Sequence, residues 1–156
     1  MKFDSRLPEY FRLKEVPWQL FATLGFRSQE SAFSFRRVML SAWLRAIAKP
    51  QRVHFKKLLF VSRLENGMSG EHWHLHVLVG GLGHLPPGFC GCADMLWKKR
   101  GGGFARITHF DPLRDGVGYV LKVPAGNSRP YRLRDEKLVT PTLSDSVMAY
   151  LRHRIP

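Results

Sequence analysis

Three histidines occupy alternate positions in the segment His72–Val79, whose sequence is HWHLHVLV. Side chains alternate between the two faces of a β-strand, so this spacing predicts a strand with all three imidazoles on one face. The intervening residues would project from the other face into a hydrophobic core; they are Trp73, Leu75, Val77 and Val79. The histidines themselves are His72, His74 and His76.

The segments around this strand predict an alternation of strands and helices. Further strands are expected where β-branched and aromatic residues alternate with small or polar ones, over 18–26, 55–65 and 104–110. Helices are expected over about 30–48, 92–99, 111–123 and 145–154, the last capped by Ser144. The Asn-Gly pair in Asn66–Gly70 predicts a hairpin loop. The resulting order β–α–β–β–α–β–α favours an α+β, ferredoxin-like fold with helices on one face of an antiparallel sheet.

A chain of 156 residues fits one domain. We expect an N-terminal arm over residues 1–16 and the main folded unit over 17–125. A basic loop and C-terminal helix over 126–156 would pack on the same domain. Cys90 and Cys92 are too close in sequence to form a regular disulfide, so we expect free thiols, with a zinc site near His84 as the weaker alternative.

Positive charge is the first indication of function, since Lys and Arg number 25 against 12 Asp and Glu, a net charge of +13. Nucleic acid is the expected partner, because neutralising phosphates releases counterions. An anionic membrane surface is less favoured, because the basic residues are spread along the chain. No apolar run is long enough to span a membrane, and Met1–Asp4 lacks a signal-peptide core, so we expect a cytoplasmic protein. The candidate DNA-backbone contacts are Arg27, Arg36, Arg37, Arg129, Arg132 and Arg134.

The histidine spacing also indicates a metal site, because imidazoles at alternate strand positions can reach one cation. Magnesium or manganese would in addition take a carboxylate. A four-residue hairpin loop would bring Glu65 closest to His72, whereas a longer, irregular loop would place it opposite His74. The third ligand is therefore open among Glu65, His72 and Glu71. The competing interpretation is a solvent-facing polar strand face without a metal.

A second candidate element is Gly116–Lys122, of sequence GVGYVLK. Tyr119 and Lys122 are three residues apart and would share one face of a helix. A tyrosine hydroxyl, with a pKa of about 10, is a poor nucleophile alone, but a nearby ammonium favours its phenolate form. By itself this spacing is far more typical of a tyrosine at the edge of a core beside a solvated lysine. It indicates chemistry only together with the histidines and the positive charge.

Three blocks of the chain, in this order, resemble the three motifs of HUH endonucleases of the Rep class, the rolling-circle replication initiators of plasmids, phages and small DNA viruses. The blocks are Phe21–Phe26 (FATLGF), His72–Val79 and Tyr119–Lys122. Trp97, Gly103 and the stretch Phe110–Asp111–Pro112 are similar to further features of bacterial relatives. The similarity spans residues 18–123 and suggests the single-tyrosine subclass. Gly25 stands where the first motif often has Thr or Ser.

The resemblance implies a five-stranded antiparallel sheet with flanking helices, forming an HUH nuclease domain over 17–125. It further implies Mn²⁺ or Mg²⁺ bound by His74 and His76, with Glu65 in the carboxylate position. Tyr119 would attack single-stranded DNA, such as an origin hairpin, to form a 5′-phosphotyrosine and a free 3′-hydroxyl. Lys122 would position the tyrosine or stabilise charge.

The chain shows no helicase-like phosphate-binding loop, so a separate helicase is an expected partner. Two alternatives remain at this point: a transposase of the same superfamily, and a non-catalytic basic module of the same fold that only binds nucleic acid.

Overall fold

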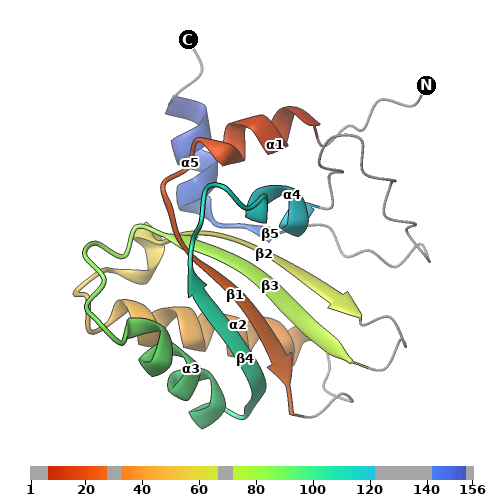
Figure 1. The fold of residues 1–156 in the computed structure, drawn as a ribbon, viewed down its shortest axis with the longest axis vertical. Helices are drawn as coiled ribbons and strands as arrows, with labels where there is room; N and C mark the ends of the chain where they lie inside the picture. The colour runs from red at the N-terminus through yellow and green to blue at the C-terminus, as the bar shows by residue number, and fades with distance from the viewer. Residues whose placement is uncertain (1–6, 28–32, 67–71, 122–141, 154–156) are drawn as a thin grey trace.

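The computed structural model describes residues 7–27, 33–66, 72–121 and 142–153 (Figure 1). Five strands of these residues form one antiparallel sheet in the order β4-β1-β3-β2-β5. Their bounds are β1 Trp18–Phe26, β2 Leu59–Asn66, β3 Trp73–Gly80, β4 Gly102–His109 and β5 Thr142–Leu143. The predicted α+β fold, with a five-stranded antiparallel sheet and flanking helices, is confirmed. The strand predicted over 18–26 has the bounds of β1.

Helices cover both faces of the sheet, which corrects the expectation of helices on one face. The helices are α1 Leu7–Lys14, α2 Phe33–Ala48, α3 Phe89–Lys99, α4 Gly116–Leu121 and α5 Asp145–His153. Figure 1 shows α2 and α3 together on one side and α1, α4 and α5 on the other. Each side has its own hydrophobic core. The reason lies in the run Val77–Val79, whose three side chains are all fully buried, so the strand contributes apolar side chains to both faces.

Successive residues along a strand point alternately into the two cores. Leu75 and Val77 of β3 join Trp43 of α2 and Trp97 of α3 in the larger core. Leu78 and other residues of the opposite face join α1, α4 and α5 in the smaller one; they include Val61, Leu13, Val117, Val120 and Val147. We call the face that carries His74 and His76 the histidine face. It is the side on which the smaller core lies, because Leu78 and His76 are two residues apart on β3.

Several predicted boundaries differ from those of the elements in the structure. The segment expected to be an arm contains α1, which is held by fully buried Leu13 and by Trp18, whose indole N–H donates to the Leu13 carbonyl at 2.8 Å. Phe55–Lys57 forms a 3₁₀ turn, η1, instead of the start of a strand. The third helix begins at Phe89, before the expected residue 92. α4 begins at Gly116, since Asp111 accepts from the Leu113 N–H in a turn at 2.9 Å.

The predicted N-cap of the C-terminal helix, Ser144, is confirmed. The Ser144 hydroxyl oxygen accepts from the Val147 N–H at 3.2 Å, which satisfies a backbone donor at the first turn of α5. The same hydroxyl donates to the Leu58 carbonyl at 3.1 Å and so ties the helix to the start of β2. Among the described residues no helix has the length and apolar character needed to cross a bilayer.

Replacing Gly102 with alanine is expected to destabilise the larger core by about 3 kcal/mol, in the range typical of overpacking. An added methyl group would overlap the indole of Trp97, which is fully buried and donates to the Gly25 carbonyl at 2.8 Å. Urea unfolding followed by circular dichroism would measure the change. The control is Gly91→Ala on α3, where a methyl group meets no atom within 4 Å and a gain in helix stability is expected. Equal stabilities for the two variants would contradict this packing.

Candidate metal centre

The register between β2 and β3 brings Glu65 beside the histidines. Glu65 lies opposite His74, and Arg63 lies opposite His76. Directly opposed residues of an antiparallel pair share one face, so all four side chains start from the histidine face. Asn66 pairs with Trp73, which leaves residues 67–72 as the connection. The longer-loop alternative is therefore the one that the structure adopts.

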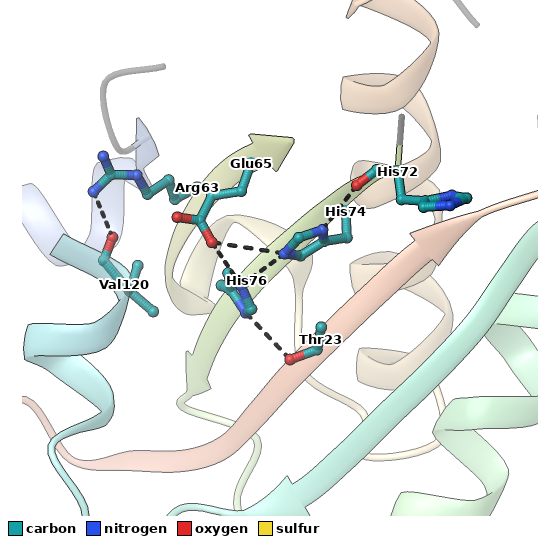
Figure 2. Close-up of polar contacts among 7 residues, drawn as sticks. All are labelled: Thr23, Arg63, Glu65, His72, His74, His76 and Val120. Carbon is teal, nitrogen blue, oxygen red and sulfur yellow. Dashed lines mark hydrogen bonds and ion pairs between the residues drawn. The ribbon is translucent and has the colours of Figure 1, made fainter. Parts of the chain in front are cut away.

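The three side chains converge through one atom each (Figure 2). The Nε2 atoms of His74 and His76 are 3.0 Å apart. Glu65 Oε2 lies 2.8 Å from His76 Nε2 and 3.6 Å from His74 Nε2. His76 is 3% exposed, Glu65 13% and His74 21%, so the cluster is closed on the His76 side and accessible from the His74 side. Among the described residues, these three form the cluster of His, Cys, Asp or Glu that could hold a metal ion.

The second nitrogen of each imidazole is held by a hydrogen-bond partner. His74 Nδ1 lies 3.1 Å from the His72 carbonyl oxygen, and since a carbonyl only accepts, the proton is on Nδ1. In a neutral His74 ring, Nε2 then carries a lone pair that points into the cluster. His76 Nδ1 lies 3.2 Å from Thr23 Oγ1 on β1. Such partners orient metal-binding histidines and fix their tautomer.

The donor set fits a divalent cation. Ligands about 2.1 Å from a metal in octahedral geometry are separated by about 3.0 Å when adjacent. Two of the three spacings, 3.0 and 2.8 Å, are close to that value, and the third is 3.6 Å. Two imidazole nitrogens and a carboxylate offer lone pairs and one negative charge to a common point, which attracts a cation.

His72, another candidate for the third ligand, does not join this cluster. His72 precedes the first residue of β3, so strict strand alternation does not extend to it, and its side chain is exposed. Figure 2 shows its ring directed away from the Glu65 carboxylate. Its backbone carbonyl supports His74 instead. Glu71 lies outside the described residues.

Tyr119 stands beside the metal cluster. Its ring centroid is 4.7 Å from that of His76, with the two planes perpendicular, and 5.9 Å from that of Phe21. The side chain is 40% exposed, so it borders both the cluster and solvent. Asp115 caps the first turn of α4, the helix that carries Tyr119, since its Oδ1 accepts from the Gly118 N–H at 3.0 Å. A side chain at position 118 would overlap that carboxylate, which explains the glycine before the tyrosine.

Arg63 is a buried residue of this region that our sequence analysis did not select. It is 2% exposed, and its Nη1 donates to the Val120 carbonyl of α4 at 3.1 Å (Figure 2). A strand residue beside His76 thus holds the helix that carries Tyr119. The signal available in the sequence was a lone arginine in the mostly apolar strand LFVSRLEN, two positions before Glu65.

Replacing Arg63 with methionine is expected to lower the free energy of unfolding by about 2 kcal/mol, because the buried Val120 carbonyl loses its donor. Methionine retains much of the apolar stem, and the three metal-binding candidates remain. We therefore expect manganese affinity to be retained while any reaction at Tyr119 slows by about tenfold, a misplacement effect. The control is Arg100→Met, since Arg100 also donates to a helix carbonyl, that of Leu96, but from the surface. Equal effects of both changes would argue against a positioning role.

A cleft of about 530 Å³ adjoins Tyr119 on the histidine face. Two exposed arginines line it, Arg106 of β4 and Arg114 of the turn before α4. Other lining residues include Phe21, Thr23, Thr108, Phe110, Asp111 and Asp115. Neither arginine was predicted from the sequence, although Arg106 alternates with Phe104 and Thr108 in a strand pattern.

The arginines predicted to contact DNA do not lie together in the structure, as far as it describes them. Arg27 is exposed at the end of β1, and Arg37 is exposed on α2, which covers the face opposite the histidines. Arg36 is 5% exposed, with its guanidinium 5.4 Å from the Phe26 ring centroid and 4.9 Å from that of Trp73. Burial lowers the Arg36 pKa. This placement gives Arg36 a packing role beside the two aromatic rings, and its selection as a DNA contact stays a prediction. Arg129, Arg132, Arg134 and the catalytic candidate Lys122 lie outside the described residues.

Both cysteines are free thiols on α3. Cys90 is partly buried, and that burial raises its pKa, which keeps the thiol protonated at neutral pH. Cys92 is exposed.

Comparisons of the chain with known protein families, curated proteins and solved structures found no significant match. The fold and the site define an α+β domain with a histidine–carboxylate cluster beside a tyrosine. This geometry and the three motifs are the features of the chain that bear on its function.

Proposed function

We propose that this protein is a metal-dependent endonuclease that nicks and rejoins single-stranded DNA, as an HUH-type rolling-circle replication initiator. The observation that carries the proposal is the 4.7 Å contact between the rings of Tyr119 and His76. It brings the third motif of the chain, a tyrosine far along the sequence, to the edge of the histidine–carboxylate cluster. A solvent-facing polar strand would not need a carboxylate and a tyrosine at the same point.

Glu65, His74 and His76 would hold a Mn²⁺ or Mg²⁺ ion through the three converging atoms. When bound, such an ion polarises the scissile phosphate and neutralises charge that develops on it. The chain's own contribution is to fix the ligands: Thr23 and the His72 carbonyl orient the two imidazoles. Arg63 holds α4, and with it Tyr119, against the cluster.

In the proposed reaction the Tyr119 hydroxyl gives up its proton to solvent, and its oxygen forms a bond to phosphorus. The bond from phosphorus to the 3′-oxygen breaks, and the departing oxygen takes up a proton to become a free 3′-hydroxyl. The DNA is then attached through a 5′-phosphotyrosine, which a 3′-hydroxyl can attack to restore the strand. Lys122, three residues after Tyr119, would favour the phenolate form by its positive charge.

Positive charge near the cleft supports a nucleic-acid substrate. Arg106 and Arg114 line the cleft at Tyr119 and would contact phosphates of the strand, with Arg27 further along β1. The net charge of +13 would add affinity that does not depend on sequence. A separate helicase, or DNA already single-stranded as in an origin hairpin, would supply the substrate. We place this activity in the cytoplasm, where Cys90 and Cys92 stay reduced.

The test is incubation of the protein with manganese and a labelled pool of single-stranded oligonucleotides of randomised sequence. The expected result is a protein–DNA adduct that survives denaturant, and sequencing the attached ends would reveal the preferred site. Salt-sensitive binding without any adduct would overturn the enzyme proposal and leave a nucleic-acid-binding module.

A further inference from the structure

One end of the histidine face is exposed. The end at Phe21 and Leu78 is covered by the smaller core with α1, α4 and α5. At the other end the exposed side chains include Phe104 of the edge strand β4. Phe104 is 58% exposed, whereas its neighbour Ala105 packs against the larger core on the opposite face of the sheet.

The Phe104 ring lies on the backbone of Gly25. An ideal Cβ atom built at Gly25 would be 2.6 Å from Phe104 Cδ1, so a side chain there would have to displace the ring. Gly25 in turn lies directly opposite His74. Phe104, Gly25 and His74 therefore follow one another across three neighbouring strands, β4, β1 and β3, on the same face. The departure at Gly25 from the first motif coincides with this aromatic ring.

Arg106 is next to Phe104 on the same face of β4. It lies opposite Thr23, whose hydroxyl contacts His76, and its side chain is exposed. Exposed aromatic rings alternating with cations on an open sheet are how proteins bind single-stranded nucleic acid: bases stack on the rings and phosphates meet the cations. An apolar protein partner would gain little from the adjacent arginine and threonines. This row of side chains ends at the metal cluster.

We propose that Phe104, seated on Gly25, is a stacking platform for a nucleobase of the bound strand near the scissile phosphate. The identity of that strand rests on the proposed function. Stacking is tolerant of base identity, so the platform would fix the path and position of the strand at the cluster, and Arg106 would hold a neighbouring phosphate. β4 and β3 are two strand spacings apart, about 10 Å, which places the stacked base beside the cluster and not within it.

The test compares binding of oligodeoxythymidine with that of an abasic strand of the same length and charge, by fluorescence anisotropy of labelled DNA. The wild-type protein should bind the thymidine strand at least about fivefold more tightly, since one stacked base contributes about 1–3 kcal/mol. Phe104→Ala should lower the affinity for the thymidine strand about tenfold and leave the affinity for the abasic strand unchanged. Phe104→Trp should restore the preference.

Phe35→Ala is the matched control, because Phe35 is 51% exposed on α2, across the sheet from the histidine face. It should leave both affinities unchanged. Gly25→Ala is a second variant that keeps the ring but displaces it, and it should also reduce the preference. Equal binding of the two strands by the wild type, or an equal loss on both in Phe104→Ala, would overturn the platform.

These outcomes are separable from those of the nicking proposal. An adduct formed by a protein that ignores base content would leave nicking in place and remove the platform. Base-dependent binding lost in Phe104→Ala, with no adduct under any condition, would keep the platform and remove nicking.

Discussion

Replacing Tyr119 with phenylalanine is expected to abolish the covalent protein–DNA adduct while the fold is retained. The change removes one hydroxyl group from a side chain that is 40% exposed. The ring contacts with Phe21 and His76 do not require that hydroxyl. Because the hydroxyl oxygen is the proposed nucleophile, adduct formation should fall by a factor on the order of a thousand or more. Denaturing electrophoresis of labelled DNA, with circular dichroism of both proteins, would measure the two quantities.

Tyr10→Phe is the control for this experiment. Tyr10 lies on α1 and packs against the smaller core, so its ring is in the same helical layer as Tyr119. It should form adduct at the wild-type rate. DNA binding at low salt should be similar in all three proteins, since no charge changes. Adduct that persists undiminished in Tyr119→Phe would remove this residue as the nucleophile.

Loss of the metal cluster is the second large effect expected. A His74→Ala, His76→Ala double variant should show no calorimetric signal with manganese, because two of three converging donor atoms are gone. The wild-type protein should be stabilised by the ion, by about 2.7 kcal/mol at a free concentration 100 times the dissociation constant. The double variant should show no such gain in urea unfolding. Adduct formation should be lost with it, and chelator treatment of the wild type should have the same effect.

The matched control replaces two exposed histidines away from the cluster, His84 and His153. It removes the same number of imidazoles and should keep the manganese isotherm and the adduct. Glu65→Gln should weaken metal binding on its own, since it keeps the size of the side chain and removes its negative charge. An isotherm unchanged in the double variant would mean that the histidine face is only a polar strand face.

The α+β fold and the central strands could be predicted because their signals are local. Alternation of side chains in 18–26 and in the histidine segment depends only on the geometry of one strand. The cap at Ser144 is likewise contained within one turn of chain. The pair His74 and His76 could be selected for the same reason, since two residues on one strand share a face without help from the rest of the molecule.

Strand geometry alone left the third candidate ligand open, because it depends on which residues of two strands lie opposite each other; the resemblance to HUH endonucleases was what pointed to Glu65. A shift of register by one residue would have turned Glu65 to the other face. The residues 67–72 between the strands decide the register, and their length alone left several pairings open. In the structure Glu65 lies opposite His74.

Contacts between distant segments decided the remainder. Arg63 could not be recognised as the support of α4, nor Arg106 as a cleft residue, until β2, β4 and α4 were placed together. Arg36 looked like a surface charge in a basic chain, but the aromatic rings of Phe26 and Trp73 enclose it. Local sequence patterns thus determined two candidate metal ligands and the α+β fold class. The carboxylate, the tyrosine beside it and the open aromatic end of the face were decided by tertiary structure, because strand register and helix packing set which side chains meet.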